Sequence, residues 1–260
     1  MKVDVVVLAG GDGAVIDPSC RFKGLLPVAG KPMVEWVVDA MRSAELVAEV
    51  AVVVPTAEDL GSWADRVDKL VVSDGDFIDN VLAGVRAFRV DRPVLVTTGD
   101  LPALTGDAVD EFLEKALRTN ADFVYPLVRR EDVLAEFPDA DRTFVRLVDG
   151  PVTGGNMLLL NPSLVEKNAS IGQTLFDTRK SALQMARVIG FRFVLRLLLG
   201  KLEVHEVEKR MGELLGGSGA AVYTSHASIG ADVDKPVDVV AAERALYEAR
   251  HGRIGGSDGE

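Results

Sequence analysis

The sequence predicts an α/β fold: a three-layer, Rossmann-like arrangement in which helices cover both faces of a mostly parallel, mixed sheet. Two observations support this prediction. Short apolar runs rich in valine recur along the chain, and the segments between them carry apolar residues at helical spacing. Strands buried on both faces read as nearly continuous apolar runs, and helices join such strands when they are parallel. Right-handed crossovers are the expected connections.

The first half of the chain shows this alternation most clearly. Four segments are predicted as strands: residues 3–10, 50–55, 69–73 and 93–100. Three amphipathic segments between them are predicted as helices: residues 31–44, 57–67 and 77–88. In an open parallel sheet, ligands bind beyond the carboxyl ends of the strands. Functional residues are therefore expected in the loops that follow these strands.

The second half is less regular. A helix is expected near residues 107–118, and the acidic segment 129–142 is interpreted as an exposed face or lid. The later strand candidates are residues 122–128, 143–150, 154–162 and 220–225. A helical pattern runs through residues 163–216, and another covers residues 237–252.

These patterns lead to one interpretation of the domain organisation. Residues 1–252 form a single domain, in which residues 163–216 are a helical insertion. Residues 253–260 offer too little apolar surface to bury, so a disordered tail is expected there.

The composition narrows the classes of function. The 260 residues include 29 basic and 40 acidic ones, a net charge of −11 that would repel the phosphate backbone of nucleic acids. No signal-peptide pattern precedes the first strand, so a cytoplasmic location is expected. The most apolar later stretch, residues 188–200, is interrupted by Arg192 and Arg196 and is too short to span a bilayer. Its apolar character makes the helical insertion a candidate interface for a homo-oligomer.

Several other kinds of site are not supported. Cys20 is the only cysteine, which excludes an intrachain disulfide and a cysteine-based zinc site. The three histidines, His205, His226 and His251, do not have metal-binding spacing. No serine-histidine-acid arrangement is visible either.

A glycine-rich turn follows the first strand. The turn LAGGDG consists of Leu8, Ala9, Gly10, Gly11, Asp12 and Gly13. Glycine amides can approach a phosphate or a base without side-chain obstruction. The spacing does not fit a dinucleotide-binding fingerprint, and the turn lacks the Gly-Lys-Ser/Thr of a P-loop. These residues alone leave two interpretations open, a nucleotide-binding turn and an unspecific tight turn.

The continuation of the turn makes the signal specific. Lys23 lies twelve residues after Gly11 and is followed by GLLPVAGKPM. The whole stretch resembles the nucleotidyltransferases that transfer a nucleoside monophosphate from an NTP to a sugar phosphate or related acceptor. The matching positions are Leu8 to Gly11, Gly13, Lys23, Leu26, Pro27 and Gly30 to Met33. The resemblance implies the nucleotide-diphospho-sugar transferase (GT-A-like) architecture.

The resemblance also implies a site for Mg²⁺ or Mn²⁺. Asp100 ends the predicted strand before GDLP and matches the family's metal-binding aspartate. A hard cation prefers carboxylate oxygen, and a strand end faces the ligand cleft. The segment GADVDKPVD looks like the close of the molybdopterin-nucleotidyltransferase-like branch, with Asp234 as the second ligand and Asp232 as its alternative. Each aspartate could instead serve a neighbouring helix N-terminus.

Two further segments resemble the substrate-binding parts of the family. In the first, DGDFIDNVLAGVRAF (residues 74–88), Asp79 and Asn80 would contact the base or ribose, although both residue types also cap helices. Gly99 is assigned to the same nucleotide-binding set. In the second, TGGNMLLL, the glycines would admit the acceptor and Asn156 could hold one of its hydroxyl groups. A β-bulge is the competing explanation for the glycines. The loop residues are Thr153, Gly154, Gly155 and Asn156.

The chain lacks one arginine of the family's motif. Val15 occupies the position of the arginine in the family's Gly-x-Arg element. Arg21 could supply the charge from the far end of the loop, or it could be a solvent-facing loop arginine. The catalytic candidates are Lys23 and Arg21. The favoured function is transfer of NMP from an NTP to a phosphorylated small-molecule acceptor with release of pyrophosphate. The alternative is a catalytically weak nucleotide- or sugar-nucleotide-binding protein whose helical insertion binds a partner.

Overall fold

A computed structural model describes residues 1–58, 60–89, 92–139, 142–178 and 181–251. The predicted disordered tail, residues 253–260, lies outside the described residues.

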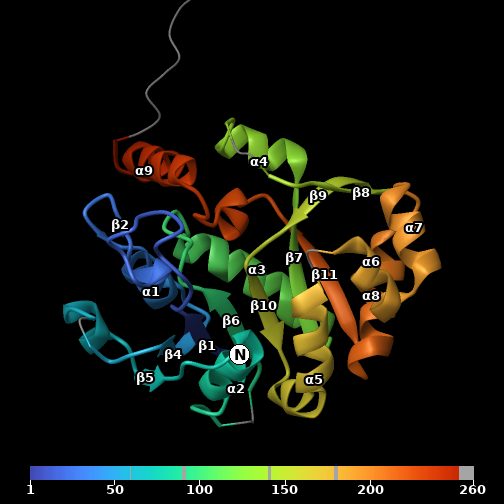
Figure 1. Ribbon diagram of the computed structural model, residues 1–260, viewed down its shortest axis with the longest axis horizontal. Coiled ribbons are helices and arrows are strands. Elements are labelled where there is room, and N and C mark those ends of the chain that lie inside the picture. Colours follow the sequence, from blue (N-terminus) through green and yellow to red (C-terminus); the bar gives the residue numbers. More distant parts are fainter. Residues whose placement is uncertain (59, 90–91, 140–141, 179–180, 252–260) are drawn as a thin grey trace, which may run out of the picture.

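A central mixed sheet organises the molecule (Figure 1). Its main path runs β5-β4-β1-β6-β10-β7-β9-β8, and β11 pairs with β7. Four strands of the first half pair in parallel within this sheet: β1 (Val3–Leu8), β4 (Val47–Val54), β5 (Lys69–Val72) and β6 (Val94–Thr98). The short strands β2 (Pro27–Val28) and β3 (Lys31–Pro32) form a separate antiparallel pair. The three-layer, mostly parallel and mixed sheet predicted from the sequence is therefore confirmed.

The second half adds strands of both directions. The strand β10 (Met157–Leu160) lies antiparallel between β6 and β7 (Phe123–Arg129). The hairpin β8 (Val145–Leu147) and β9 (Gly150–Gly154) continues from β7, while β11 (Gly219–Thr224) runs parallel to β7. This order brings the end of β6 next to the segment that precedes β10.

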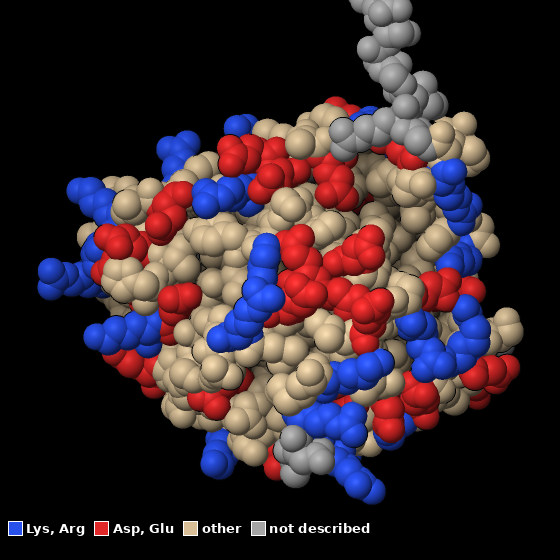
Figure 2. Space-filling view, turned by 180° about the vertical axis from the view of Figure 1, so that it is seen from behind, with Lys and Arg blue, Asp and Glu red and all other residues tan. Residues whose placement is uncertain are grey.

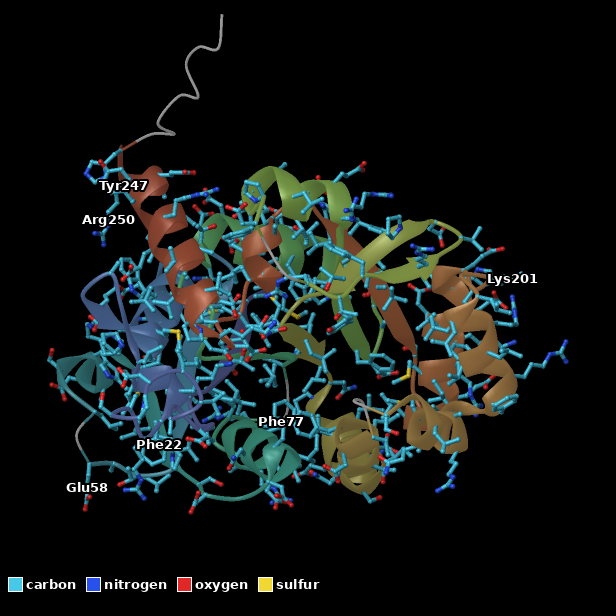
Figure 3. The ribbon with its side chains drawn as sticks, turned by 45° about the horizontal axis from the view of Figure 1, so that its top comes forward. Phe22, Glu58, Phe77, Lys201, Tyr247 and Arg250 are labelled. Carbon is cyan, nitrogen blue, oxygen red and sulfur yellow. The ribbon has the colours of Figure 1, made fainter. Side chains whose placement is uncertain are left out.

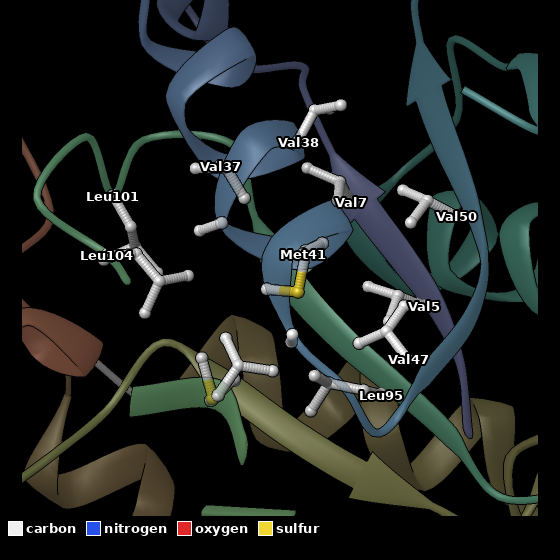
Figure 4. Packing of buried hydrophobic residues seen from close by; sticks show 14 of the residues in the cluster. Val5, Val7, Val37, Val38, Met41, Val47, Val50, Leu95, Leu101 and Leu104 are labelled. Carbon is white, nitrogen blue, oxygen red and sulfur yellow. The ribbon is translucent and has the colours of Figure 1, made fainter. Parts of the chain in front are cut away.

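The helices α1 (Met33–Ser43) and α3 (Gly106–Thr119) cover one face of the sheet. Figure 4 shows Val37 and Met41 of α1 packed over Val5 and Val7 of β1. All six residues of β1 are buried, as expected for a central strand with helices on both faces.

The opposite face is covered by α2 (Phe77–Val85), α5 (Pro162–Thr178) and α8 (Val204–Leu215). The helix α2 packs very closely on β1, because a Cβ at Gly84 would lie 2.4 Å from Cγ1 of Val6. This close packing positions the N-terminus of α2 near the glycine turn that follows β1.

Residues 163–216 contain most of α5, then α6 (Ala182–Ile189), α7 (Phe191–Leu198) and α8. The helix α9 (Pro236–His251) ends the described chain. Among the described residues, none of the helices combines the length and the apolar character needed to cross a membrane.

One segment differs from the sequence-based expectation. The segment 57–67, predicted as a helix, contains only the short 3-10 helix η2 (Ser62–Arg66) in its described part. Gly61 precedes it with φ of 74°, a conformation that an α-helix cannot continue through. The acidic segment expected as an exposed face or lid forms the helix α4 (Arg130–Glu136), in which Val133 is buried.

Figure 2 shows one face of the molecule, on which acidic and basic side chains are interspersed and a compact acidic group lies near the middle.

Candidate active site

The glycine turn and Lys23 come together because the chain folds back on itself after β1. Gly11 has φ of +90°, which favours glycine, and its carbonyl accepts a hydrogen bond from the amide of Lys23 at 3.0 Å. The amide of Gly13 donates to the carbonyl of Arg21 at 3.3 Å. Lys23, which begins the 3-10 helix η1 (Lys23–Leu25), therefore lies beside the turn despite its distance in sequence.

Lys23 forms the centre of a charged group at the carboxyl edge of the sheet. Its Nζ donates to Oδ2 of Asp100 at 2.5 Å and also to Oδ1 of Asp234. The side chains of Lys23 and Asp100 are 15% and 13% exposed, whereas that of Asp234 is 64% exposed. The ammonium thus connects the end of β6 with the loop before α9.

Asp232 completes a group of three carboxylates. Suitable oxygen atoms of Asp100, Asp232 and Asp234 all lie within 4.8 Å of one another. Asp232 is paired with Arg142, and the amide of Val233 donates to the carbonyl of Asp100 at 3.0 Å. Two loops that are far apart in sequence are therefore held together at this site.

The donor set fits a hard divalent cation. Oδ1 of Asp100 is buried and has no hydrogen-bond partner among the described residues. Carboxylate oxygens are preferred ligands of Mg²⁺ and Mn²⁺. The residues able to hold such an ion are therefore Asp100, Asp234 and Asp232.

The closeness of these charged groups, together with their burial, shifts their pKa values. Burial tends to lower the pKa of Lys23, but Asp100 and Asp234 outweigh it, and the pKa of the ammonium lies above its ordinary value. Burial raises the pKa of Asp232, and the nearby Asp100 raises it further. Burial tends to raise the pKa of Asp234, but the hydrogen bond from Lys23 outweighs it and holds that pKa below its ordinary value. At neutral pH, Lys23 is thus a cation held between carboxylates.

These residues lie at one end of a cavity of about 1460 Å³. The predicted nucleotide-binding residues that line this cavity are Leu8, Gly10, Gly11, Asn80 and Gly99. The others, Ala9, Asp12, Gly13 and Asp79, are not among its described lining residues. The glycine turn therefore faces the cavity through its first half.

Asn80 does not cap its helix with the side chain. The cap position of α2 is Asp76, and Nδ2 of Asn80 donates to the carbonyl of Gly75 at 2.9 Å. Oδ1 of Asn80 and Oγ1 of Thr98 are buried without a partner among the described residues, and both residues line the cavity. The hydrogen-bonding capacity of both atoms is therefore unsatisfied among the described residues.

The predicted acceptor loop is divided between two cavities. Gly155 and Asn156 line the large cavity. Thr153, Gly154 and Asn156 line a smaller cavity of about 550 Å³, which is also bounded by α9. Asn156 is thus shared by both cavities.

Arg21 is separate from this group. Its side chain is exposed, and its guanidinium lies over the ring of Phe22, 4.8 Å from the ring centroid. Arg21 is not among the described residues that line the large cavity, and Val15, at the family arginine position, is 71% exposed. Its catalytic role stays a prediction.

The competing helix-capping explanations receive little support from the geometry. Thr105, not Asp100, caps α3, and its side chain accepts from the amide of Ala108. At the start of α9, the amides of Asp234 and Lys235 both donate to Oδ2 of Asp238. The carboxylate of Asp234 instead contacts Lys23.

Arg142 also belongs to this site, although no sequence pattern indicated it. It belongs to the acidic segment expected as a lid, and it contacts Asp232, which lies 90 positions later in the sequence. An arginine at the end of an acidic segment carries no local signal for such a contact.

The mixed sheet, the glycine turn and the carboxylates at the strand ends define the fold class of the nucleotide-diphospho-sugar transferases. The chain belongs to the family of MobA-like NTP transferase domains, which it matches over residues 5–186.

Solved structures agree with this membership. A hypothetical transferase from Thermus thermophilus is 36% identical, with a TM-score of 0.83 over 92% of this chain and 100% of that one. A CMP:2-keto-3-deoxy-manno-octonic acid synthetase complexed with CTP is 14% identical, with a TM-score of 0.64 over 96% of this chain and 100% of that one. The second likeness concerns the fold alone.

A curated relative matches only part of the chain. The bifunctional protein GlmU of Exiguobacterium sibiricum is 30% identical over 126 residues, which make up 45% of this chain and 26% of GlmU. The matched region thus spans about a quarter of the length of that relative.

Proposed function

We propose that this protein is a divalent-cation-dependent nucleotidyltransferase that transfers NMP from an NTP to a phosphorylated small-molecule acceptor. The observation that carries the proposal is the contact of Lys23 with Asp100 and Asp234 beside the glycine turn. A cation and a set of carboxylates at this edge suit the charge distribution of a triphosphate and its metal.

The proposed reaction is an in-line displacement. An oxygen of the acceptor phosphate attacks the α-phosphorus of the NTP, and a new O–P bond forms. The bond from the α-phosphorus to the bridging oxygen breaks, and pyrophosphate leaves with the electron pair. A phosphate monoester is already nucleophilic near neutral pH, so no residue has to remove a proton. The residues position the substrates and neutralise the developing charge.

The residues have separate roles in this proposal. Asp100, Asp234 and Asp232 would hold Mg²⁺ or Mn²⁺, which when bound neutralises phosphate charge. The ammonium of Lys23 would bind a phosphate oxygen. The amides at Gly10 and Gly11 would approach the nucleotide phosphates.

The nucleotide and the acceptor would occupy opposite parts of the large cavity. Oδ1 of Asn80 would accept from the base or ribose, on the side of α2. Gly155 and Asn156 line the cavity on the side of β10, where the acceptor would bind.

Pyrophosphate release tests the proposal. The protein is incubated with Mg²⁺, each of the four common NTPs and a panel of phosphorylated acceptors. Transfer predicts pyrophosphate release that depends on both substrates, and mass spectrometry would detect the NMP-acceptor product.

A second function is favoured by one observation. Because Val15 and Arg21 leave the loop without a second cation facing the cavity, the protein could bind a nucleotide without reacting. Stabilisation by an NTP in the absence of turnover with every acceptor would support this binding function.

The helical insertion is the proposed homo-oligomer interface. Phe191 and Leu198 lie two turns apart on α7, and both are 69% exposed, which is unusual for such large apolar side chains. Light scattering coupled to size exclusion would test this, with a monomer as the contradicting result.

A further inference from the structure

The large cavity has two chemically different ends. The charged side chains among its described lining residues are Lys23, Asp76, Asp100, Asp232 and Asp234. All of them belong to the carboxyl edge of the sheet or to the start of α2. The far end extends under α5, α6, α7 and α8, so the charges are confined to one end of a continuous space.

The far end is apolar. Its walls include Leu158 and Leu160 of β10, Met185 of α6, Leu197 of α7 and Met211 of α8. Asn168 is the only polar side chain that the described residues of α5 to α8 contribute, and its Nδ2 already donates to the carbonyl of Leu164 at 3.0 Å. A sugar at this end would bury hydroxyl groups without partners, which is unfavourable.

The volume leaves room for more than a nucleotide. A pocket for one small molecule usually measures roughly 300–1,000 Å³, whereas this cavity measures about 1460 Å³. The ring of Phe77 on α2, which is labelled in Figure 3, stacks on the ring of Phe176 on α5 with 4.0 Å between centroids, where the two helices meet. Both rings line the cavity and extend its apolar surface toward the nucleotide side.

We infer that the acceptor is an amphiphile, a phosphate monoester that carries an apolar chain. Its phosphate lies at Lys23 and the carboxylates, and its chain extends along β10 under α6 to α8. This inference rests on the proposed transfer reaction and names the chemical class of its acceptor. The covalent step is unchanged: the acceptor phosphate oxygen bonds to the α-phosphorus, and pyrophosphate leaves.

The rim of the cavity gives a long chain an outlet. Leu198 lines the cavity and is 69% exposed. Leu195, about one helical turn before it, and Leu199, the next residue, are 45% and 59% exposed. The apolar surface therefore continues from the interior to the outside of α7.

Equilibrium binding of alkyl phosphates to the whole protein tests the inference without requiring turnover. Methyl, butyl and octyl phosphate are titrated by calorimetry in the presence of Mg²⁺, below their aggregation concentrations. We expect affinity to rise by up to about fourfold for each methylene that becomes buried, the equivalent of about 0.8 kcal/mol. Affinity that does not depend on chain length would overturn the inference.

Matched variants locate the alkyl chain of the bound ligand. Met185→Trp fills the apolar end from α6, and we expect it to weaken octyl phosphate binding about tenfold with methyl phosphate unaffected. Leu183→Trp is the control, because Leu183 lies on the same helix, is 66% exposed and does not line the cavity. Met211→Trp, on α8, replaces Met185→Trp if circular dichroism shows that the latter is unfolded. Equal effects of the cavity and control variants would contradict the inference.

The two proposals can fail separately. Pyrophosphate release with sugar phosphates, together with no dependence on chain length, would overturn the inference and leave nucleotidyl transfer in place. Chain-dependent binding without pyrophosphate release from any NTP would retain the inference and overturn the transfer reaction.

A further arm identifies the source of the amphiphile. Vesicles of phosphatidylcholine with and without phosphatidic acid are floated with the protein. If the protein floats only with vesicles that contain phosphatidic acid, and Leu198→Ser reduces this flotation, the amphiphile is a membrane lipid. Binding of monomeric octyl phosphate without vesicle binding assigns a freely diffusing amphiphile, and both results support the inferred chemistry.

Discussion

The ammonium of Lys23 lies 2.5 Å from Oδ2 of Asp100 and joins the loop after the first strand to the end of β6. The two residues are 77 positions apart in the sequence. Their contact occurs because β1 and β6 are parallel neighbours, so that both strands end at the same edge of the sheet.

Replacement of Lys23 by alanine is expected to reduce the rate of pyrophosphate release by about 100-fold or more, because preorganised charge at the phosphates is lost. The measurement is steady-state pyrophosphate release with a reactive NTP and acceptor. Lys31→Ala is the matched control, since Lys31 belongs to the same motif but pairs with Asp39 and does not line the cavity. Equal losses in the two variants would remove Lys23 from the proposed site.

Replacement of Asp100 by asparagine is expected to remove stabilisation by Mg²⁺. In the wild-type protein, Mg²⁺ at ten times its Kd would stabilise the fold by about 1.4 kcal/mol and raise the Tm by roughly 3–6 °C. Differential scanning calorimetry at several Mg²⁺ concentrations measures this shift. Asp107→Asn, an exposed change on α3, should keep the full shift, and an Asp100→Asn protein that also keeps it would contradict the metal assignment.

Asn80→Ala is expected to weaken NTP binding by about tenfold with little change in stability, because Asn80 lines the cavity and its buried Oδ1 has no partner among the described residues. Asp79→Ala is the control on the same helix, since Asp79 is exposed and is not among the described residues that line the cavity. Calorimetric titration with NTP measures both variants. Weaker binding in Asp79→Ala alone would reverse this assignment.

Asp122 is expected to contribute stability that depends on pH. The backbone and hydroxyl of Ser218 donate to its carboxylate and, with Asn161, lower its pKa below the ordinary 3.8. A lowered pKa means that the stabilisation is fully present above pH 4–5 and disappears as the pH falls through the pKa of the folded state. Because the carboxylate is largely exposed, the contribution is about 1 kcal/mol at most.

Urea unfolding of Asp122→Ala at a series of pH values measures this contribution. The variant should unfold at lower urea concentration than the wild type at pH 7, and the two midpoints should converge toward pH 2. A difference that persists unchanged at pH 2 would show that the carboxylate charge is not its cause.

Much of the site could be predicted because its signals are local. The glycine turn and Asp100 each follow a recognisable apolar run, Lys23 precedes the motif GLLPVAGKPM, and all of them reach the large cavity. Asp232 and Asp234 precede a predicted helix and lie within 4.8 Å of Asp100. The orientation of Arg21 over Phe22 was not predictable, because the loop hydrogen bonds that set it join residues on both sides of the turn.

By itself, the sequence determined the four main parallel strands of the first half, the family and the residues of the glycine turn and of the end of β6. Spacing and apolar periodicity act within a few turns of chain, so they were sufficient for these features. The tertiary structure alone decided that β10 lies antiparallel between β6 and β7, that Arg142 meets Asp232, and that α5 to α8 enclose an apolar space. These features depend on contacts between distant segments, whose free energy is set by packing and charge pairing across the fold and leaves no local pattern.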